Sequence, residues 1–532
     1  MSDNWDHNAP GGPQREGARL GAAAALLAGS ILLSRLLGYL RDVVLADRVG
    51  AGAQADAYYA AFQIPDLLNY LLAGGALAIA FIPLYSRTRE ARGRQAAERL
   101  FACVLGNVGL AALVTTGLLW FYAEALISLQ FPDFDAETKA LTVRLTRIVL
   151  PAQVFFLTGG IVRAVLMAHG RFGAQAAAPL LYNLAVIAGG LATGTPEGFA
   201  WGVLVGSVLG PFVVPLFDLA RMRTLRLRVR LAFDPDFKKY LWVALPLMLG
   251  LSLATVDEWY ERWFGATLAV GTVAHLSFAR KLMMAPVAVV GQAVAAAALP
   301  FLARLFAAGE REALNRTLLQ TLRVSLVLAV LSGTACAVLA RPLVEFVYRH
   351  GRFGEQDAVA VASILFVLAF AVPAWVTQQI AVRAFYARGD TWRPMILATG
   401  VALAAIPLYL TLTRTHGAPG IALAGVLAMT VNAVATLVWG ARRFDGPALA
   451  PLFGSGLRAL GIGLVAGLAA GFAQPRVAPG WEGALLDLAV GGGVFLAVSG
   501  MGCWWWGDDA MRTGIAAIGA RLPRWLRGRT LK

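Results

Sequence analysis

Long apolar segments separated by short polar ones run along almost the whole chain. A transmembrane helix needs about 20 mostly apolar residues, and these segments reach that length without the two-residue alternation of a membrane β-barrel. The pattern therefore predicts an all-α polytopic membrane protein with about fourteen transmembrane helices. The expected spans are residues 18–47, 55–86, 99–123, 139–167, 174–194, 198–220, 239–264, 272–303, 314–340, 357–386, 394–413, 418–440, 455–473 and 483–506.

Composition and charge agree with this class. Of the 532 residues, 58% are hydrophobic and 14% are charged, which a soluble protein could sustain only with an implausibly large core. The net charge of +15 comes from Lys and Arg that concentrate in the tails and in alternate loops. Basic loops mark the cytoplasmic side of membrane helices, so both termini are expected in the cytoplasm. Anionic lipid headgroups account for this charge, and no nucleic-acid partner is expected.

An internal repeat predicts the architecture. Three short stretches recur at offsets of 217, 220 and 221 residues, and they are marked by the pairs Pro83 and Pro300, Arg163 and Arg383, and Pro65 and Pro286. Because the repeat contains six spans, an even number, the two copies should insert in the same orientation around an axis along the membrane normal. We expect a disordered cytoplasmic tail at 1–16, six-helix lobes at 17–235 and 236–445, two further helices at 446–510, and a basic cytoplasmic tail at 511–532.

Charged residues inside the expected spans are the candidate binding site. A charge at membrane depth costs about 2.5–3.5 kcal/mol on insertion scales, so it normally faces a bundle interior or an aqueous cavity. Two parallel lobes bind substrate between them, and arginine forks suit a phosphate or pyrophosphate. Asp42 or Asp56 would hold an arginine in place, and structural ion pairs are the alternative role for all these charges. The charged candidates are Arg35, Arg41, Asp42, Asp56, Arg280 and Lys281.

Three acidic residues late in the seventh expected span form a second group. Asp257, Glu258 and Glu261 are expected to pair with arginines, to bind a coupling ion or to face periplasmic water. Arg144 and Arg147 in the fourth span either line the cleft or lie on the surface.

Motifs for catalysis are missing from the sequence. The three cysteines form no CxxC pattern and are expected to be small packing residues, and there is no Walker lysine, HExxH or GxSxG motif. We therefore expect a transporter with no catalytic residues, no cofactor and no metal.

Three stretches carry a family resemblance: SRLLGYLRDVVLADRVGAGAQADAYYAAFQIPDLL, AHGRFGAQAAAPLLYNL and FYARGDTWRP. They resemble the MurJ/MviN family of lipid II flippases, in the multidrug/oligosaccharidyl-lipid/polysaccharide exporter superfamily. The resemblance implies that the protein moves undecaprenyl-pyrophosphate-linked peptidoglycan precursor across the bacterial inner membrane. It also implies a cationic cavity for the headgroup and a groove at the last two helices for the lipid tail.

The sequence departs from the family pattern at two places. Asn69 and Tyr70 stand in PDLLNYLLAGGA where the family shows a basic pair, and Asn69 is therefore an additional candidate for substrate binding. In the eighth span an ADRL-type motif is replaced by ARKL, which contains Arg280 and Lys281.

Other functions remain open at the sequence level. A flippase for another polyprenyl-linked saccharide and a cation-coupled exporter of small molecules are alternatives within transport. A transport-dead scaffold and a membrane glycosyltransferase are alternatives of a different class. The expected partners are lipid II or a related polyprenyl-pyrophosphate glycan, membrane lipids and cell-wall synthesis enzymes, and the chain is expected to be a monomer.

Overall fold

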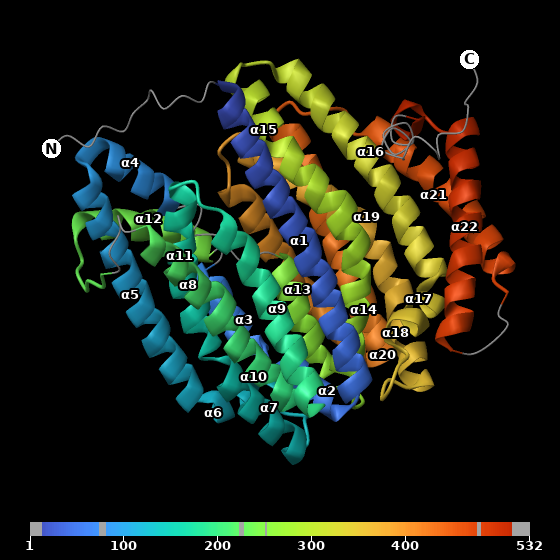
Figure 1. The fold of residues 1–532 in the computed structure, drawn as a ribbon. Coiled ribbons are helices and arrows are strands. Elements are labelled where there is room, and N and C mark those ends of the chain that lie inside the picture. Colours follow the sequence, from blue (N-terminus) through green and yellow to red (C-terminus); the bar gives the residue numbers. More distant parts are fainter. Residues whose placement is uncertain (1–12, 74–80, 223–227, 250–252, 476–479, 513–532) are drawn as a thin grey trace. The chain divides into compact units, whose positions relative to one another are not determined.

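The computed structural model describes residues 13–73, 81–222, 228–249, 253–475 and 480–512 (Figure 1). Regular structure within these ranges is entirely helical, which confirms the all-α prediction. The first half contains α1 (Pro13–Val49), α2 (Ala53–Ala61), α3 (Gln63–Ala73), α4 (Ile82–Arg92), α5 (Arg94–Phe121), α6 (Ala123–Gln130), α7 (Ala136–Val149), α8 (Ala152–Ala168), α9 (Gly173–Thr193), α10 (Pro196–Ser207), η2 (Val208–Val213) and α11 (Val214–Arg221). The second half contains α12 (Pro235–Leu249), α13 (Leu253–Gly265), α14 (Thr272–Pro286), η3 (Val287–Gln292), α15 (Ala293–Ala307), α16 (Arg311–Val338), α17 (Ala340–Tyr348), α18 (Glu355–Leu368), η4 (Ala369–Ala371), α19 (Val372–Tyr386), α20 (Trp392–Arg443), α21 (Ala450–Ala473) and α22 (Trp481–Trp505).

Ten helical segments among the described residues are long and apolar enough to cross a membrane, so the chain is a multi-pass membrane protein. This number counts α20 once, although Gly417 interrupts that helix with φ 59° and ψ −136°. The interruption falls between the expected spans 394–413 and 418–440. Part of the expected span 55–86 lies outside the described residues, and the total of fourteen stays a prediction.

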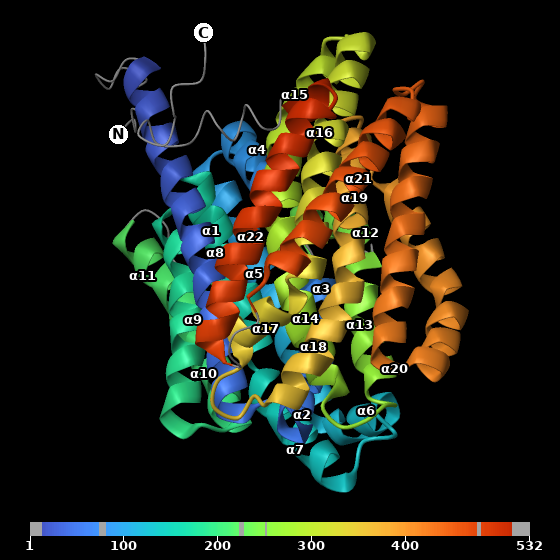
Figure 2. The same cartoon turned by 90° about the vertical axis from the view of Figure 1, so that its right-hand side faces the viewer.

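The chain divides into two compact units. Unit 1 comprises Met1–Arg48, Ala61–Gln130 and Ala136–Leu249, and unit 2 comprises Val49–Ala60, Phe131–Asp135 and Gly250–Lys532. A buried cluster in unit 1 joins α4, α5, α8 and α12. In unit 2, α16 and α21 pack together and α21 packs on α22, as Figure 2 shows. All three cysteines are free and buried, as expected of packing residues.

Small residues let helices of unit 1 approach closely. Gly198, Gly202, Gly206 and Gly210 recur every fourth residue along α10 and η2 on the side that faces α9. A Cβ at Gly202 would lie 2.7 Å from the carbonyl oxygen of Ala185, so no larger residue fits without a backbone shift. Close backbone packing of this kind is a main source of helix association in membranes, where lipid competes for apolar contacts.

The internal repeat extends to the boundaries of the helices. α5 and α16 are both 28 residues long, and α16 begins 217 residues after α5. Each is followed by a short helix, α6 or α17, whose first residues Ala123 and Ala340 are again 217 positions apart. The duplication inferred from short motifs therefore also accounts for the order and length of these elements.

Candidate functional site

The charged stretch of unit 1 lies on α1. Asn183 of α9 donates hydrogen bonds to the carbonyl and hydroxyl oxygens of Ser34, at 3.3 and 3.2 Å, and these bonds fix one side of α1. The adjacent Arg35 is half-buried. About two helical turns further on, Asp42 is buried and accepts hydrogen bonds from Nε and Nη2 of Arg41, at 3.2 and 3.1 Å. Asp42 is thus the acid that pairs with an arginine here.

Asp56 has a different partner. Its carboxylate accepts hydrogen bonds from the backbone N–H groups of Gly271 (2.5 Å) and Ala274 (2.8 Å) at the start of α14. Carboxylates are favourable at this end of a helix because the first N–H groups lack partners within the helix. Gly271 has a φ of 92°, and a Cβ there would lie 2.5 Å from the carbonyl oxygen of Ala51. Asp56 and this close approach together attach the 49–60 segment to α14.

A buried ionic network in unit 2 surrounds Arg280 of α14. Its Nε and Nη2 donate to the two carboxylate oxygens of Glu261, both at 2.5 Å, and Nη2 also donates to Asp257 at 2.5 Å. The Tyr409 hydroxyl of α20 donates to the second oxygen of Asp257. Arg280, Asp257 and Glu261 are each less than one-tenth exposed.

This network assigns partners to the acidic residues of α13. Asp257 and Glu261 pair with an arginine, which was one of the three expected arrangements. Glu258 is exposed and accepts a hydrogen bond from Arg262 at 2.5 Å. Asp257, Glu261 and Arg280, by contrast, are buried. Buried charges are tolerated only when they are paired and hydrogen-bonded.

Lys281 and Asn69 are the remaining candidates. Lys281 is half-buried and follows Arg280, but successive residues on a helix point in directions about 100° apart, so the two side chains leave α14 on different sides. Asn69 and Tyr70 are half-buried on α3 in unit 1. The roles of all these residues toward a substrate stay predictions.

Sequence reasoning missed two members of the network. Tyr409 and Gly425 lie in apolar stretches of α20 and carry no charge that would single them out. A Cβ at Gly425 would lie 2.8 Å from the Asp257 carboxylate and 3.1 Å from the Tyr409 hydroxyl, so only glycine fits there without displacing them.

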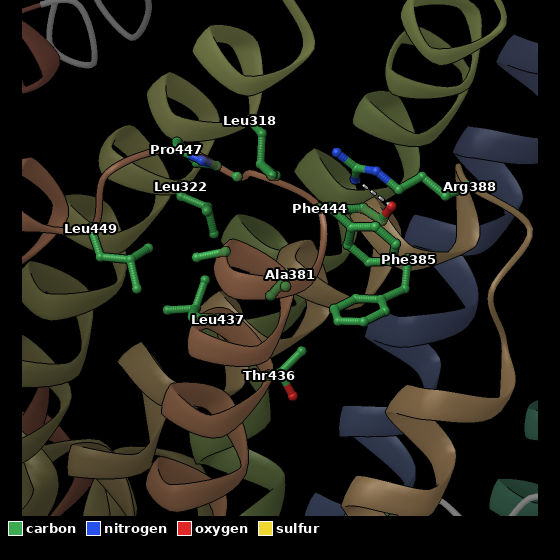
Figure 3. A pocket seen from close by; sticks show the side chains of 14 residues that line it. Leu318, Leu322, Ala381, Phe385, Arg388, Thr436, Leu437, Phe444, Pro447 and Leu449 are labelled. Atoms are coloured by element: carbon green, nitrogen blue, oxygen red, sulfur yellow. Dashed lines mark hydrogen bonds between the residues drawn. The ribbon is translucent and has the colours of Figure 1, made fainter. Parts of the chain in front are cut away.

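One apolar cavity in unit 2 is too small for a substrate. It lies among α16, α19, the last turns of α20 and the segment after α20, and its volume is about 30 Å³ (Figure 3). Leu318, Leu322 and Phe385 line it, and the guanidinium of Arg388 at its edge lies 4.6 Å from the centre of the Phe444 ring. This volume is about the volume that one water molecule occupies in the liquid. Among the residues that the structure describes, no group of three or more His, Cys, Asp and Glu side chains is arranged to hold a metal ion.

Comparison with known proteins identifies the family. A sequence model described as "Lipid II flippase MurJ" matches residues 45–483. The chain is 30% identical over 434 residues to a probable lipid II flippase MurJ of Rhizobium meliloti, covering 78% of this chain and 80% of the relative. It is 29% identical over 431 residues to the corresponding protein of Bdellovibrio bacteriovorus, covering 77% and 80%.

The fold agrees with this assignment. A solved structure described as "Lipid II flippase MurJ, inward closed conformation" matches with a TM-score of 0.74 and 22% identity, covering 90% of this chain and 99% of that chain. The family match extends over most of the chain and includes α2, the Arg280 network and the kinked α20. This protein is therefore a member of the lipid II flippase MurJ family.

Proposed function

We propose that this chain moves lipid II, an undecaprenyl-pyrophosphate-linked peptidoglycan precursor, from the cytoplasmic to the periplasmic leaflet of a bacterial inner membrane. The observation that carries the proposal is the family match over residues 45–483. The similarity to lipid II flippases of other bacteria and the fold shared with one of them support it.

The physical task is to carry a diphosphate headgroup past about 30 Å of hydrocarbon while the lipid tail stays in the membrane. The protein need only supply compensating positive charge in a wet cavity and open that cavity alternately to each side. Arg35, Arg41 and Lys281 are the proposed ligands of the headgroup, and Asn69 is a further proposed contact. Asp42 then acts as a positioning residue, because its bond to Arg41 fixes the direction of the guanidinium.

Arg280 has a supporting role in this proposal. Its donors point at two buried carboxylates, so we assign it to the packing of α13, α14 and α20. Asp257 and Glu261 are the counter-charges in this assignment.

Asp56 is the proposed closing contact. It belongs to the expected N-terminal lobe, whereas Gly271 and Ala274 belong to the expected C-terminal lobe, and the bonds between them join the two repeats. Alternating access would require these bonds to break and form again. The same proposal includes the two-lobe division and the cytoplasmic position of both termini. It also includes the monomeric state and contact with cell-wall enzymes.

Complementation tests the function directly. A cell depleted of its own lipid II flippase is given this chain or the Arg35→Ala/Arg41→Ala/Lys281→Ala variant at equal membrane level. We expect growth with the natural chain and lysis with the variant. Lysis with a well-expressed natural chain would contradict lipid II as cargo. Growth with the variant would contradict the cationic-cavity mechanism.

A further inference from the structure

A surface cavity of unit 1 combines two arginines with two tryptophans. Its volume is about 560 Å³, within the range of sites that bind organic ligands. Arg144 and Arg147 of α7 line it together with Trp120 of α5 and Trp201 of α10, and Pro151 and Leu204 add apolar surface. The transport mechanism uses none of these residues.

The two arginines are held in place by the cavity walls. Residues three positions apart on a helix share a face, so both guanidinium groups leave α7 on the same side. The Arg147 guanidinium lies 5.2 Å from the centre of the Trp120 ring, and its Nε donates to the Trp120 carbonyl oxygen at 3.4 Å. Arg144 pairs with Glu197 at the start of α10, at 3.1 Å.

The carboxylate nearest to Arg147 leaves the positive charge of that side chain accessible. Glu124 lies 4.0 Å from Arg147, and its side chain is 77% exposed, so this pair is at the limit of an ion pair and is weak in water. The Arg144 side chain is itself 62% exposed. A planar guanidinium that keeps exposed donors binds a phosphate at two oxygens.

The cavity lies near helix ends, at the depth expected for lipid headgroups. Trp120 is the second-last residue of α5, and Trp201 is less than two turns from the start of α10. Trp120 and Trp201 are 46% and 53% exposed. Tryptophan is enriched at the membrane–water interface because its ring is amphipathic, and arginine side chains bind phosphate groups through two parallel hydrogen bonds.

We propose that this cavity binds the phosphate and the first acyl methylene groups of an anionic phospholipid, separately from the transported lipid. The arginine pair matches the phosphate charge, and Trp201, Pro151 and Leu204 match the apolar chain. A soluble anion would use the arginines alone and would leave this apolar surface in contact with water.

Fluorescence quenching tests the site in the full-length protein. The chain is reconstituted into phosphatidylcholine vesicles that contain increasing amounts of brominated phosphatidylglycerol, and bromine quenches nearby tryptophans. We expect a saturable component of quenching that the Trp120→Phe/Trp201→Phe variant lacks. The Arg144→Gln/Arg147→Gln variant should need about tenfold more phosphatidylglycerol, because the charged hydrogen bonds to the phosphate are lost. Arg414→Gln, an exposed arginine of α20, is the matched control and should behave like the natural chain.

A second variant separates filling of the cavity from loss of charge. Ala140 lines the cavity, so Ala140→Phe should weaken the saturable component with both arginines present, whereas Ala125→Phe on the exposed side of α6 should not. Equal saturable quenching by brominated phosphatidylcholine would overturn the proposal. The proposal would also be overturned if the saturable quenching by brominated phosphatidylglycerol persisted unchanged in both the Arg144→Gln/Arg147→Gln variant and the Ala140→Phe variant. Loss of quenching on addition of soluble glycerol phosphate would assign the site to a free anion instead.

Discussion

Gly425 is tightly enclosed by the Arg280 network. An alanine there would bring its Cβ to 2.8 Å from the Asp257 carboxylate, so we expect Gly425→Ala to lower the free energy of unfolding by about 1–3 kcal/mol, as overpacking does. Gly400 lies on the same helix with open space around it, so Gly400→Ala should be neutral or should stabilise by up to about 1 kcal/mol. Thermal unfolding of the purified variants measures both effects. Equal stability of the two variants would contradict the packing described for Asp257 and Tyr409.

Arg280 itself should be essential for folding. Arg280→Met leaves Asp257 and Glu261 buried without their shared cation, and breaking a buried ion pair costs about 3–5 kcal/mol. Neutralising both acids in the triple variant Arg280→Met/Asp257→Asn/Glu261→Gln should recover part of the loss. Membrane yield and melting temperature are the readouts. A single variant as stable as the natural chain would show that the network is not needed for stability.

Arg41 needs a control for its own ion pair. Arg41→Ala removes the proposed headgroup ligand and also leaves the buried Asp42 without this partner, so lost function could reflect instability. The Arg41→Ala/Asp42→Asn double variant removes that complication. We expect it to reach the membrane at the normal level and to lose lipid II flipping, whereas Arg41→Lys should keep part of the activity because the charge remains but the two-donor geometry is lost. Full flipping by the double variant would contradict the role of Arg41.

The charged residues of the site could be chosen from the sequence because charge at membrane depth is rare. The partners of these charged residues could not be identified from the sequence. Pairing of Arg280 with α13 depends on how three helices pack, and Tyr409 has no sequence feature that separates it from other aromatic residues in apolar spans. The same limit applies to Asp56, whose partners are backbone N–H groups that no side-chain pattern reveals.

At the scale of elements, hydrogen bonds of Asp508 attach the last helices to α16 within unit 2; we call this contact the polar clamp. Asp508, just after α22, accepts hydrogen bonds from Ser455 of α21 and from Arg323 of α16, the latter at 2.8 Å. Burial opposes ionisation of Asp508, but the bonds from Ser455 and Arg323 outweigh it and hold the pKa of this carboxyl below its usual value. Such a group stabilises the fold above its unfolded pKa of about 3.9, and the contribution disappears as pH falls through the lower folded pKa.

This clamp predicts a pH-dependent difference between two variants. Asp508→Asn should melt at a lower temperature than the natural chain at neutral pH, and the difference should shrink below about pH 4 as Asp508 becomes protonated in the natural chain. Asp133→Asn at an exposed position between α6 and α7 is the control and should melt like the natural chain at neutral pH. A difference that stays constant down to strongly acidic pH would contradict the ionic part of the clamp.

Most helices could be predicted from the sequence, because apolar segments of membrane length have few other stable conformations. The break in α20 was also predictable, since the polar residues around Gly417 interrupt the apolar pattern. The π-helical segments η2 and η3 could not be predicted, because each lies within a continuous apolar stretch. The short helices α6 and α17 escaped prediction for a different reason: they lie in polar-flanked segments too short to span a membrane.

At the scale of the whole molecule, the repeat is the feature that sequence and structure share. Its offset of 217 residues recurs at the starts of α5 and α16 and at the starts of α6 and α17. Duplication predicts that the two six-helix halves superpose by a rotation about the membrane normal, and an experimental structure in a lipid bilayer would test this. An antiparallel relation between the halves would contradict the duplication. The sequence could not predict which conformation the halves adopt, because alternating access requires at least two of similar free energy.

The most direct test of the central claim is the leaflet position of lipid II in cells that depend on this chain. Lipid II exposed on the outer leaflet is cleaved by an enzyme added to the periplasmic side, and the cleaved fraction is measured while membrane protein levels are held equal. The account predicts that the natural chain restores cleavage within one depletion cycle and that the Arg35→Ala/Arg41→Ala/Lys281→Ala variant leaves lipid II protected. Protected lipid II with the natural chain, or normal cleavage with the variant, would contradict it.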